Sequence, residues 1–315
     1  MALNLAMLYR GSLASCNYAC DYCPFAKRVD PPEALRQDRQ QLERFVDWIA
    51  HRATIAPEDR YSVLVTPWGE ALVRWWYADA LARLSHLPNV TKSAIQTNLS
   101  GKLDWLPSAN VAKLGLWCTY HPNEVTRERF LQQCQRLLDA GVPFSVGVVG
   151  LKEHADEIAA LRAALPKSVY LWINAYKRTP DYTDSELLER FTAIDPLFPI
   201  NTVRHRSQGH ACRTGDSVIS VDGDGTMRRC HFVREPIGNL YDADFADALR
   251  PRLCENATCG CHIGYVHLER LGLNRVFGSG VLERIPRGNV DGSEQFPGGH
   301  FDANLLSCPE LSRNG

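Results

Sequence analysis

The 315-residue sequence has no apolar run that approaches the roughly 20 residues a membrane-spanning helix needs. It also lacks an excess of charge of one sign, because 35 Lys and Arg residues are balanced by 36 Asp and Glu residues. Nucleic-acid binding, which a basic excess would favour, is therefore disfavoured. The N-terminus lacks a basic segment, and Asn4 interrupts its apolar run, so we expect a first strand there and no export signal. Internal repeats and low-complexity tracts are absent as well.

Cysteine, in contrast, is abundant, with eleven residues in the chain. In a chain of this length without an export signal, a disulfide framework is not expected. The cysteines therefore predict metal or redox chemistry in the cytoplasm.

Short apolar runs alternate with longer amphipathic ones from about residue 3 to residue 200. We predict strands at 3–9, 61–65, 92–97, 114–120, 144–150 and 169–176. Helices are predicted between them at 33–53, 71–84, 123–140, 152–164 and 184–193. This alternation needs a parallel sheet with helical crossovers. The predicted fold class is α/β, a partial (β/α)6 TIM-like barrel, and a flat doubly wound sheet is the alternative.

The pattern changes beyond about residue 200, where cysteines return among Gly- and Asp-rich turns. The stretch VISV-DGDG-TMRRC at 218–230 predicts a hairpin. We predict three parts: the barrel at 1–205, a small cysteine-rich metal-binding domain at 206–283, and an irregular tail or cap at 284–315. The tail contains a remote cysteine, Cys308.

Cys16, Cys20 and Cys23 form a C-x3-C-x2-C group in the long connection after the first predicted strand. In a β/α barrel, such connections form the active face. Three thiolates on a short loop can bind three irons of a cubane and leave the fourth iron open, as a catalytic metal requires. Tyr22 would lie close to that open position. A structural zinc site would need a fourth ligand, which the sequence does not supply nearby, and His121, a lone loop histidine, is not assigned a role.

The spacing C-x3-C-x-(aromatic)-C after a first strand resembles the signature of the radical S-adenosylmethionine (SAM) superfamily. As architecture, the resemblance extends over about the first 200 residues. It implies a [4Fe–4S] cluster on Cys16, Cys20 and Cys23, whose open iron is chelated by the amino and carboxylate groups of SAM. Reduction would cleave SAM to methionine and a 5′-deoxyadenosyl radical, which takes a hydrogen atom from the substrate.

Other positions resemble the SAM-binding motifs of the superfamily. The stretch 66–70 is similar to its Gly-Gly-Glu motif, with Trp68 in place of the first glycine, and implies that Gly69 and Glu70 receive the SAM ammonium. An acceptor-only carboxylate suits that role, although Glu70 would equally favour the start of a helix. Thr97-Asn98 resembles the Thr-Asn pair of the superfamily. Asn174, late in the sixth strand, is expected on the same face, and Tyr22, Asn98 and Asn174 complete the expected SAM-binding set.

The second cysteine group consists of Cys212, Cys230, Cys254, Cys259 and Cys261. With the DGDG turn and Gly238-Asn239, it resembles the SPASM and twitch cluster domains of radical SAM enzymes. Two extra cubanes would need about seven or eight thiolates, so the five imply one auxiliary [4Fe–4S] cluster. Its expected ligands are Cys212, Cys230 and two of the other three. A closed Cys3His zinc site using His262 or His267 is the alternative.

The resemblance thus implies a cytoplasmic radical SAM enzyme that acts on a small molecule or peptide and receives electrons from flavodoxin or ferredoxin. The sequence does not identify the substrate. A non-catalytic iron–sulfur scaffold, sensor or electron carrier is the alternative, because Trp68 would make the SAM site degenerate. A zinc-stabilised binding protein is a third hypothesis.

Overall fold

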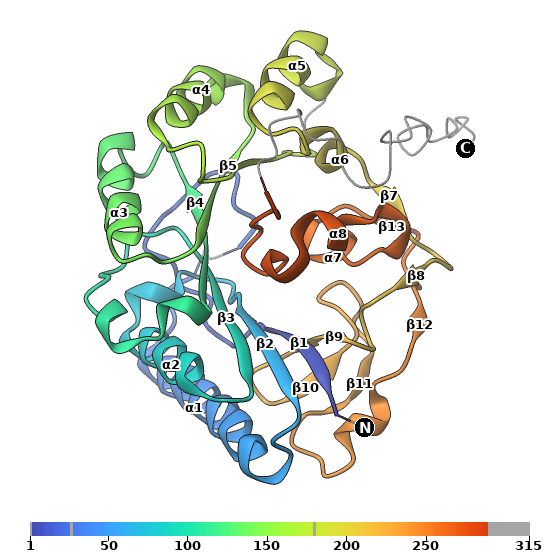
Figure 1. Cartoon of the computed structure of the whole chain (residues 1–315). Helices are drawn as coiled ribbons and strands as arrows, with labels where there is room; N and C mark the ends of the chain where they lie inside the picture. Colours follow the sequence, from blue (N-terminus) through green and yellow to red (C-terminus); the bar gives the residue numbers. More distant parts are fainter. Residues whose placement is uncertain (1, 26–27, 179–180, 289–315) are drawn as a thin grey trace.

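The computed structural model describes residues 2–25, 28–178 and 181–288. Six parallel strands lie side by side in sequence order. They are β1 (Asn4–Tyr9), β2 (Arg60–Val65), β3 (Val90–Thr97), β4 (Leu114–Tyr120), β5 (Phe144–Val149) and β6 (Leu171–Asn174). In Figure 1 this sheet curves around a centre with its connecting helices on the outside. A doubly wound sheet would reverse its strand order, so the predicted partial barrel is confirmed.

The helices that connect these strands lie close to their predicted positions. They are α1 (Pro32–Ile55), α2 (Trp75–His86), α3 (Arg127–Asp139), α4 (Ala155–Ala164) and α5 (Ser185–Ile194). The side chains of Leu42, Phe45, Val46 and Ile49 make the buried face of α1, at the 3- and 4-residue spacing seen in the sequence. None of the helices in the described part of the chain is long and apolar enough to cross a membrane.

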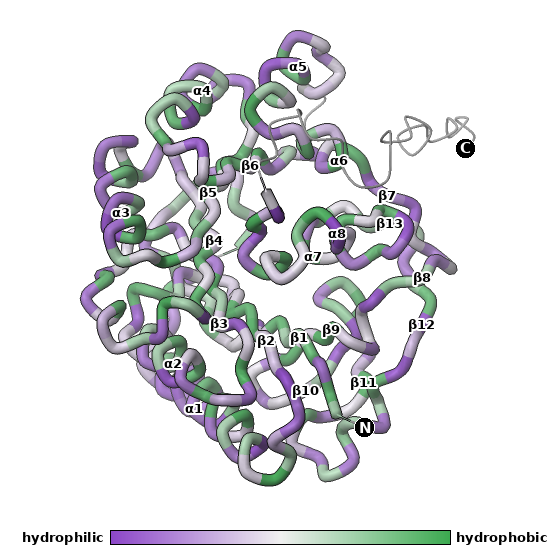
Figure 2. Tube along the Cα trace, viewed as in Figure 1, coloured by the Kyte–Doolittle hydropathy of each residue, from purple (hydrophilic) through white to green (hydrophobic). Residues whose placement is uncertain are grey.

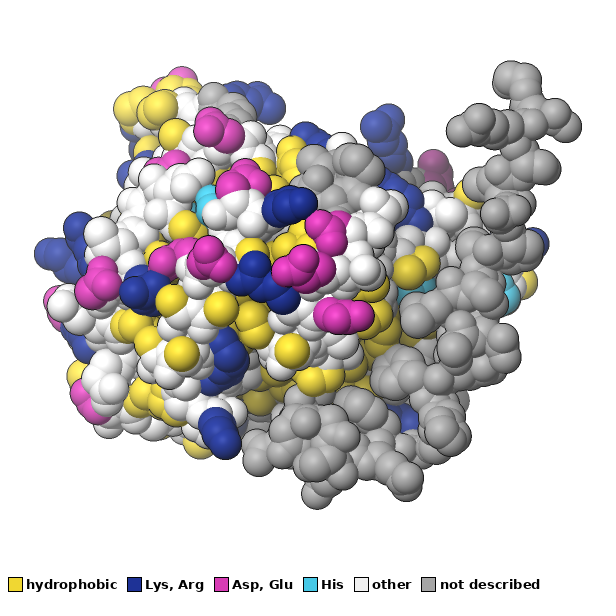
Figure 3. Space-filling model, turned by 90° about the horizontal axis from the view of Figure 1, so that it is seen from above, with side chains coloured by type: hydrophobic (Ala, Val, Ile, Leu, Met, Phe, Trp, Pro, Cys, Tyr) yellow, Lys and Arg dark blue, Asp and Glu magenta, His cyan; other side chains and the backbone are white. Residues whose placement is uncertain are grey.

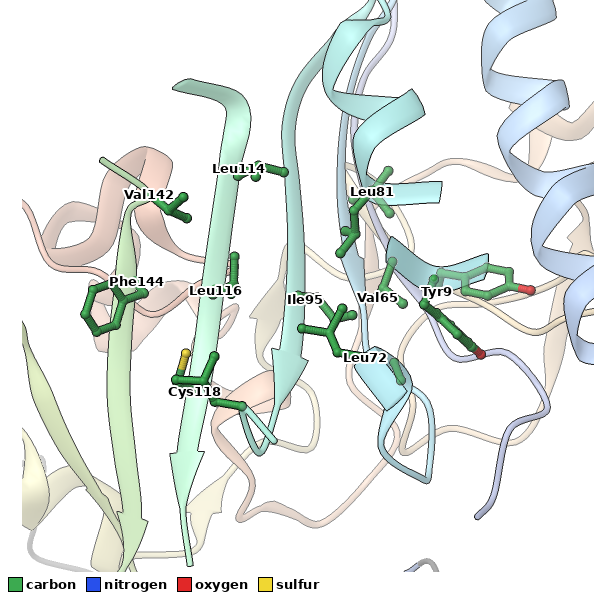
Figure 4. Close-up of a cluster of buried hydrophobic side chains, with 14 of the residues drawn as sticks. Tyr9, Val65, Leu72, Leu81, Ile95, Leu114, Leu116, Cys118, Val142 and Phe144 are labelled. Carbon is green, nitrogen blue, oxygen red and sulfur yellow. The ribbon is translucent and has the colours of Figure 1, made fainter. Parts of the chain in front are cut away.

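The largest hydrophobic core lies between the outer face of the sheet and the helices. Figure 4 shows its layer of side chains, with Val65, Ile95 and Leu116 from neighbouring strands and Leu81 from α2. Tyr9 packs against Phe45 of α1 with ring centroids 4.5 Å apart. Cys118 and Cys134 belong to this core and are almost completely buried. Figure 2 shows the consequence for hydropathy, with apolar strands inside and polar residues on the outer helices.

The second half of the chain adds short elements, several of which extend the same sheet. These are α6 (Phe198–Thr202), β7 (His205–Arg206), β8 (Ala211–Cys212), β9 (Val218–Val221), β10 (Thr226–Arg228), β11 (Pro236–Asn239), β12 (Arg252–Leu253), β13 (Thr258–Cys259), α7 (His262–Tyr265) and α8 (Leu273–Phe277). The predicted hairpin is β9–β10, and β9 pairs in parallel with β1. The sheet therefore continues beyond residue 205, the predicted end of the barrel. Its full strand order is β11-β10-β9-β1-β2-β3-β4-β5-β6.

The chain then returns to fill the inside of the curved sheet. Leu282 packs in a second apolar cluster with Leu8 and Trp117 on the inner face. Next to it, Glu283 is buried and forms an ion pair of 2.8 Å with Lys92. In Figure 1, α7 and α8 lie within the curve of the sheet. The described part of the predicted tail ends at residue 288, and Cys308 lies outside the described residues.

Charged side chains of both signs are visible on one face of the molecule (Figure 3). On the face shown in Figure 3, Lys and Arg side chains lie among Asp and Glu side chains.

Candidate functional site

The first three cysteines lie on the connection between β1 and α1, at the carboxyl end of the parallel strands. Two carboxylates fix the start of this loop. Asp38 of α1 accepts hydrogen bonds from the backbone N–H groups of Ser12 (3.1 Å) and Leu13 (2.9 Å). Asp30 accepts from those of Ala14 and Ser15, both at 2.8 Å. The cysteine loop is therefore held to the barrel immediately before Cys16.

The stretch after β2 packs directly against this loop. The backbone N–H groups of Trp68 and Gly69 donate to the carbonyl of Leu13, and that of Glu70 donates to the carbonyl of Ser15. A Cβ atom at Gly69 would lie 1.9 Å from the Ser15 carbonyl oxygen. Glycine is thus required at residue 69 by the close approach of the two backbones.

Glu70 is buried at the centre of this arrangement, with 3% of its surface exposed. Its Oε1 accepts hydrogen bonds from the Leu72 N–H (2.9 Å) and the Thr97 hydroxyl (2.7 Å), and its Oε2 accepts one from the Asn98 N–H (2.6 Å). Burial raises the pKa of Glu70, and these three donors oppose the shift. No cation among the described residues contributes to it. Glu70 therefore fixes the ends of β2 and β3 and leaves a buried negative charge without a counterion.

The thiols of the loop lie in surroundings that differ from one cysteine to the next. The Tyr18 N–H donates to Cys16 Sγ at 3.4 Å, and the Phe25 N–H donates to Cys23 Sγ at the same distance. Burial raises the pKa of Cys16, and it raises that of Cys20 to about 12. Backbone N–H donors to sulfur are among the features by which a protein adjusts an iron–sulfur cluster.

His121, which the sequence left unassigned, lies beside this loop. Its Nδ1 is 3.3 Å from Cys20 Sγ and 2.8 Å from the Tyr22 hydroxyl, and its ring stacks on that of Tyr22. Burial lowers the pKa of His121 to about 4, so the ring is neutral at pH 7. A clue was present in the sequence, because His121 directly follows β4 and so lies at the same edge of the sheet as the cysteine loop.

Asn98 brings β3 into contact with the first cysteine. Its Nδ2 lies 3.8 Å from Cys16 Sγ and 3.1 Å from the side-chain oxygen of Asn17. Asn17 in turn donates to the Ser100 hydroxyl at 3.0 Å. Asn174 lies at the end of β6, where its carbonyl accepts the Gly150 N–H, and no hydrogen bond among the described residues joins it to the cysteine loop.

The five cysteines of the second group come together around the short strands of the C-terminal half. Cys212 lies in β8 and pairs with Arg252 of β12, while Cys259 lies in β13 and pairs with His205 of β7. Burial raises the pKa of Cys230, and the neighbouring thiols of Cys212 and Cys254 raise it further. In the same way burial raises the pKa of Cys259 to about 12, with contributions from Cys261, Cys230 and Cys254.

The two histidines of the alternative zinc site are packed as core residues. His262 contacts Trp117, Tyr265 and Phe277 edge-on, and burial lowers its pKa well below the usual value. His267 is also buried, and its pKa falls to about 4 for the same reason.

Arg10 and Trp68 contact each other close to both cysteine groups, since Trp68 packs on Phe25 and Arg10 interacts with the charge of Cys261. The guanidinium carbon of Arg10, at the end of β1, is 4.2 Å from the centre of the Trp68 ring, and Phe25 packs against the same ring at 4.7 Å. Arg10 is 9% exposed, and its Nε has no hydrogen-bond partner in the described part of the chain. Burial lowers the pKa of Arg10 to about 10, although the charges of Cys261 and Asp222 act to raise it.

The donor sets suit iron–sulfur clusters. No disulfide joins any of the ten cysteines that the structure describes. Within residues 2–25, 28–178 and 181–288, no three His, Cys, Asp or Glu side chains converge as the ligands of a single ion would. A cubane makes a different demand, because each thiolate binds a different iron. Three thiols on one anchored loop fit that demand.

Comparisons with known proteins bear on the fold alone. No family model and no curated protein matches the sequence. Among solved structures, native anSMEcpe with bound AdoMet is similar, with a TM-score of 0.52 and 13% identity over 77% of this chain and 80% of that chain. The polyhistidine-tagged form of anSMEcpe with bound AdoMet gives a TM-score of 0.50 and 12% identity over 77% and 78% of the two chains. anSMEcpe is a radical SAM enzyme.

The chain has the radical SAM fold. Within this radical SAM fold, the first cysteine loop, Glu70 and Asn98 meet at the carboxyl ends of β1, β2 and β3. The roles of these residues, and of the second cysteine group, stay predictions from the sequence.

Proposed function

We propose that the protein is a radical SAM enzyme that cleaves SAM reductively and removes a hydrogen atom from a small molecule or a peptide. The observation that carries this proposal is the buried carboxylate of Glu70, which has three donors and, among the residues that the structure describes, no cation paired with it. A buried charge without a counterion is costly. The ammonium group of SAM would supply the missing positive charge, next to a loop of three thiols.

In the proposed site, Cys16, Cys20 and Cys23 hold three irons of a [4Fe–4S] cluster and leave one iron open for SAM. When bound and reduced, cluster and SAM together supply a carbon radical that abstracts hydrogen. The chain orients SAM and the substrate and excludes water from the site. Glu70 orients the ammonium group, while Gly69 lets the backbone of 68–70 lie against the cysteine loop. Asn98 borders the cysteine loop from the end of β3, and Tyr22 is part of the loop itself.

We further propose one auxiliary [4Fe–4S] cluster on Cys212 and Cys230 with two of Cys254, Cys259 and Cys261, in a cluster-binding part at 206–283. The charge interactions among these thiols support a common site. Such a cluster would accept an electron from the substrate or bind it directly. Trp68, which packs on Phe25, and Arg10, which interacts with the charge of Cys261, would contact a substrate placed between the two groups.

The second candidate is an iron–sulfur carrier or sensor without SAM chemistry. Trp68 favours it, because this ring stands where the superfamily has a glycine and is 41% exposed.

The test is anaerobic reconstitution with iron and sulfide, reduction by dithionite, and measurement of 5′-deoxyadenosine by mass spectrometry. We expect 5′-deoxyadenosine from the wild-type protein. In the triple variant Cys16→Ala, Cys20→Ala, Cys23→Ala we expect a loss of about four irons per chain, one cubane, and no product. Cys134→Ala removes a buried core thiol from α3 and is the matched control, which should keep both.

Three results would separate the hypotheses. Product from the triple variant would refute the assignment of the first cysteine loop. Bound iron without product in the wild-type protein would favour the carrier or sensor. Zinc without iron and sulfide would favour a zinc-stabilised binding protein.

A further inference from the structure

His121 contacts three alternate residues of the first cysteine loop. Its ring stacks on that of Tyr22, with centroids 5.8 Å apart and 14° between the ring planes. It meets the ring of Tyr18 edge-on, at 5.9 Å. Cys20 lies between these tyrosines in the sequence, and its Sγ is 3.3 Å from His121 Nδ1. One histidine is therefore surrounded by three loop residues, and the middle one is a predicted ligand of the first cluster.

The turn after β4 holds His121 in this place. The His121 carbonyl accepts the N–H groups of Glu124 (3.0 Å) and Val125 (3.2 Å). The carboxylate of Glu124 in turn accepts the Ala19 N–H of the cysteine loop at 3.1 Å. The end of β4 is thus joined to the loop twice, through the Glu124 carboxylate and through the His121 ring.

His121 Nδ1, the Tyr22 hydroxyl and the Cys20 sulfur lie within hydrogen-bond distance of one another. Nδ1 is 2.8 Å from the hydroxyl and 3.3 Å from the sulfur, and the hydroxyl also hydrogen-bonds to Cys20. A cysteine bound to iron is a thiolate, which can only accept. The imidazole and the hydroxyl must then supply the protons, because a bare Nδ1 would direct its lone pair at a negatively charged sulfur. When Cys20 is a ligand, the proton of the neutral ring is therefore on Nδ1.

We propose that His121 is a positioning residue that donates from Nδ1 to the Cys20 thiolate, with the Tyr22 hydroxyl as a second donor, and so raises the reduction potential of the first cluster. This inference rests on the proposed function, and it adds a residue from β4 that controls how readily the cluster is reduced. One electron from a reductant such as dithionite enters the cluster, and no bond forms or breaks. Because the reduced cluster is more negative, donors to its sulfur ligands stabilise the reduced state more than the oxidised one.

Four single variants of the full chain test this role. His121→Phe removes Nδ1 and keeps a ring that can stack on Tyr22. His121→Asn is the rescue variant, because its side-chain amide again offers an N–H donor near the position of Nδ1. Tyr22→Phe removes the second donor. His86→Phe is the matched control, because His86 is an exposed histidine at the last position of α2, at the opposite end of the strands from the cysteine loop.

Each protein is reconstituted anaerobically with iron and sulfide, and the first cluster is titrated with dithionite at controlled potential and followed by electron paramagnetic resonance. The signal of the first cluster is the one that the Cys16→Ala, Cys20→Ala, Cys23→Ala variant lacks. At a fixed potential we expect the ratio of reduced to oxidised cluster to fall about tenfold in His121→Phe, which is a shift of about 59 mV for one electron. Tyr22→Phe should shift in the same direction. His121→Asn should recover most of the loss, and His86→Phe should titrate as the wild type does.

Wild-type potentials in both His121→Phe and Tyr22→Phe would overturn the proposal, because packing alone would then explain the contact. A three-iron cluster in His121→Phe would also overturn it, since His121 would then be a ligand of the fourth iron. If His121→Phe takes up no cluster, Tyr22→Phe decides, because a lowered potential supports the donors and an unchanged one refutes them.

The titration uses no SAM, so it is separate from the test of the proposed function. Shifted potentials in a protein that makes no 5′-deoxyadenosine would support the role of His121 and contradict the SAM chemistry. A wild-type protein without any signal that depends on the three cysteines would overturn both.

Discussion

Replacing Glu70 by alanine removes the acceptor for three buried donors at once: the N–H groups of Leu72 and Asn98 and the hydroxyl of Thr97. A buried donor left without a partner costs about 1–3 kcal/mol. Three of them would cost more than about 3 kcal/mol, and relief from burying the carboxylate offsets part of this. We therefore expect Glu70→Ala to lower the free energy of unfolding by about 3 kcal/mol.

Glu70→Gln separates the shape of the side chain from its charge. The glutamine oxygen can still accept from Leu72 and Thr97, but its amide nitrogen would face the Asn98 N–H, so about one hydrogen bond is lost. We expect a smaller loss of stability, about 1–2 kcal/mol. Without the negative charge, the affinity of the reconstituted protein for SAM should fall at least about tenfold.

Urea denaturation followed by circular dichroism gives the stability of both variants, and equilibrium dialysis gives the dissociation constant of SAM. Glu189→Ala, at an exposed position of α5, is the control. An Ala variant within about 0.5 kcal/mol of the wild type would refute the reasoning about the three donors. A Gln variant that binds SAM as tightly as the wild type would show that the carboxylate has only a structural role.

Two further predictions concern the loop and the base of the sheet. Gly69→Ala would place Cβ 1.9 Å from the backbone oxygen of Ser15, so we expect reconstitution to yield less iron and the melting temperature to fall. The control is Gly223→Ala, whose Cβ would meet only the end of the Gln41 side chain and which should bind iron normally. Equal iron in both variants would contradict the close approach of Gly69 to Ser15. Asp59 is nearly buried, and although burial alone would raise its pKa, hydrogen bonds from Leu3, Arg52 and Tyr61 lower it below the usual 3.8. This carboxylate therefore stabilises the fold above pH 3.8, and the contribution is lost as the pH falls below that value. The stability difference between the wild type and Asp59→Asn, measured by urea denaturation, should shrink as the pH is lowered through this range, and a difference independent of pH would count against it.

The hydrophobic periodicity of the sequence was sufficient to predict the barrel. Val65, Ile95 and Leu116 lie in strands whose apolar runs are short and rich in branched residues, and the buried face of α1 repeats every three to four positions. Periodicity does not report pairing between strands distant in sequence. It could not predict that β9 would pair with β1 and continue the sheet.

The candidate site divides in the same way. The cysteine spacing by itself predicted a loop that would hold three irons, because that spacing is local and follows a strand. The fold decided what surrounds the loop: His121 beside Cys20 and Tyr22, Arg10 on Trp68, and the backbone of Ser15 against Gly69. These contacts join residues from different strands, which meet because parallel strands present their carboxyl ends at one edge. The sequence thus determined which chemical groups the protein has, and only tertiary packing decided which of them are buried together and which charges lack a partner.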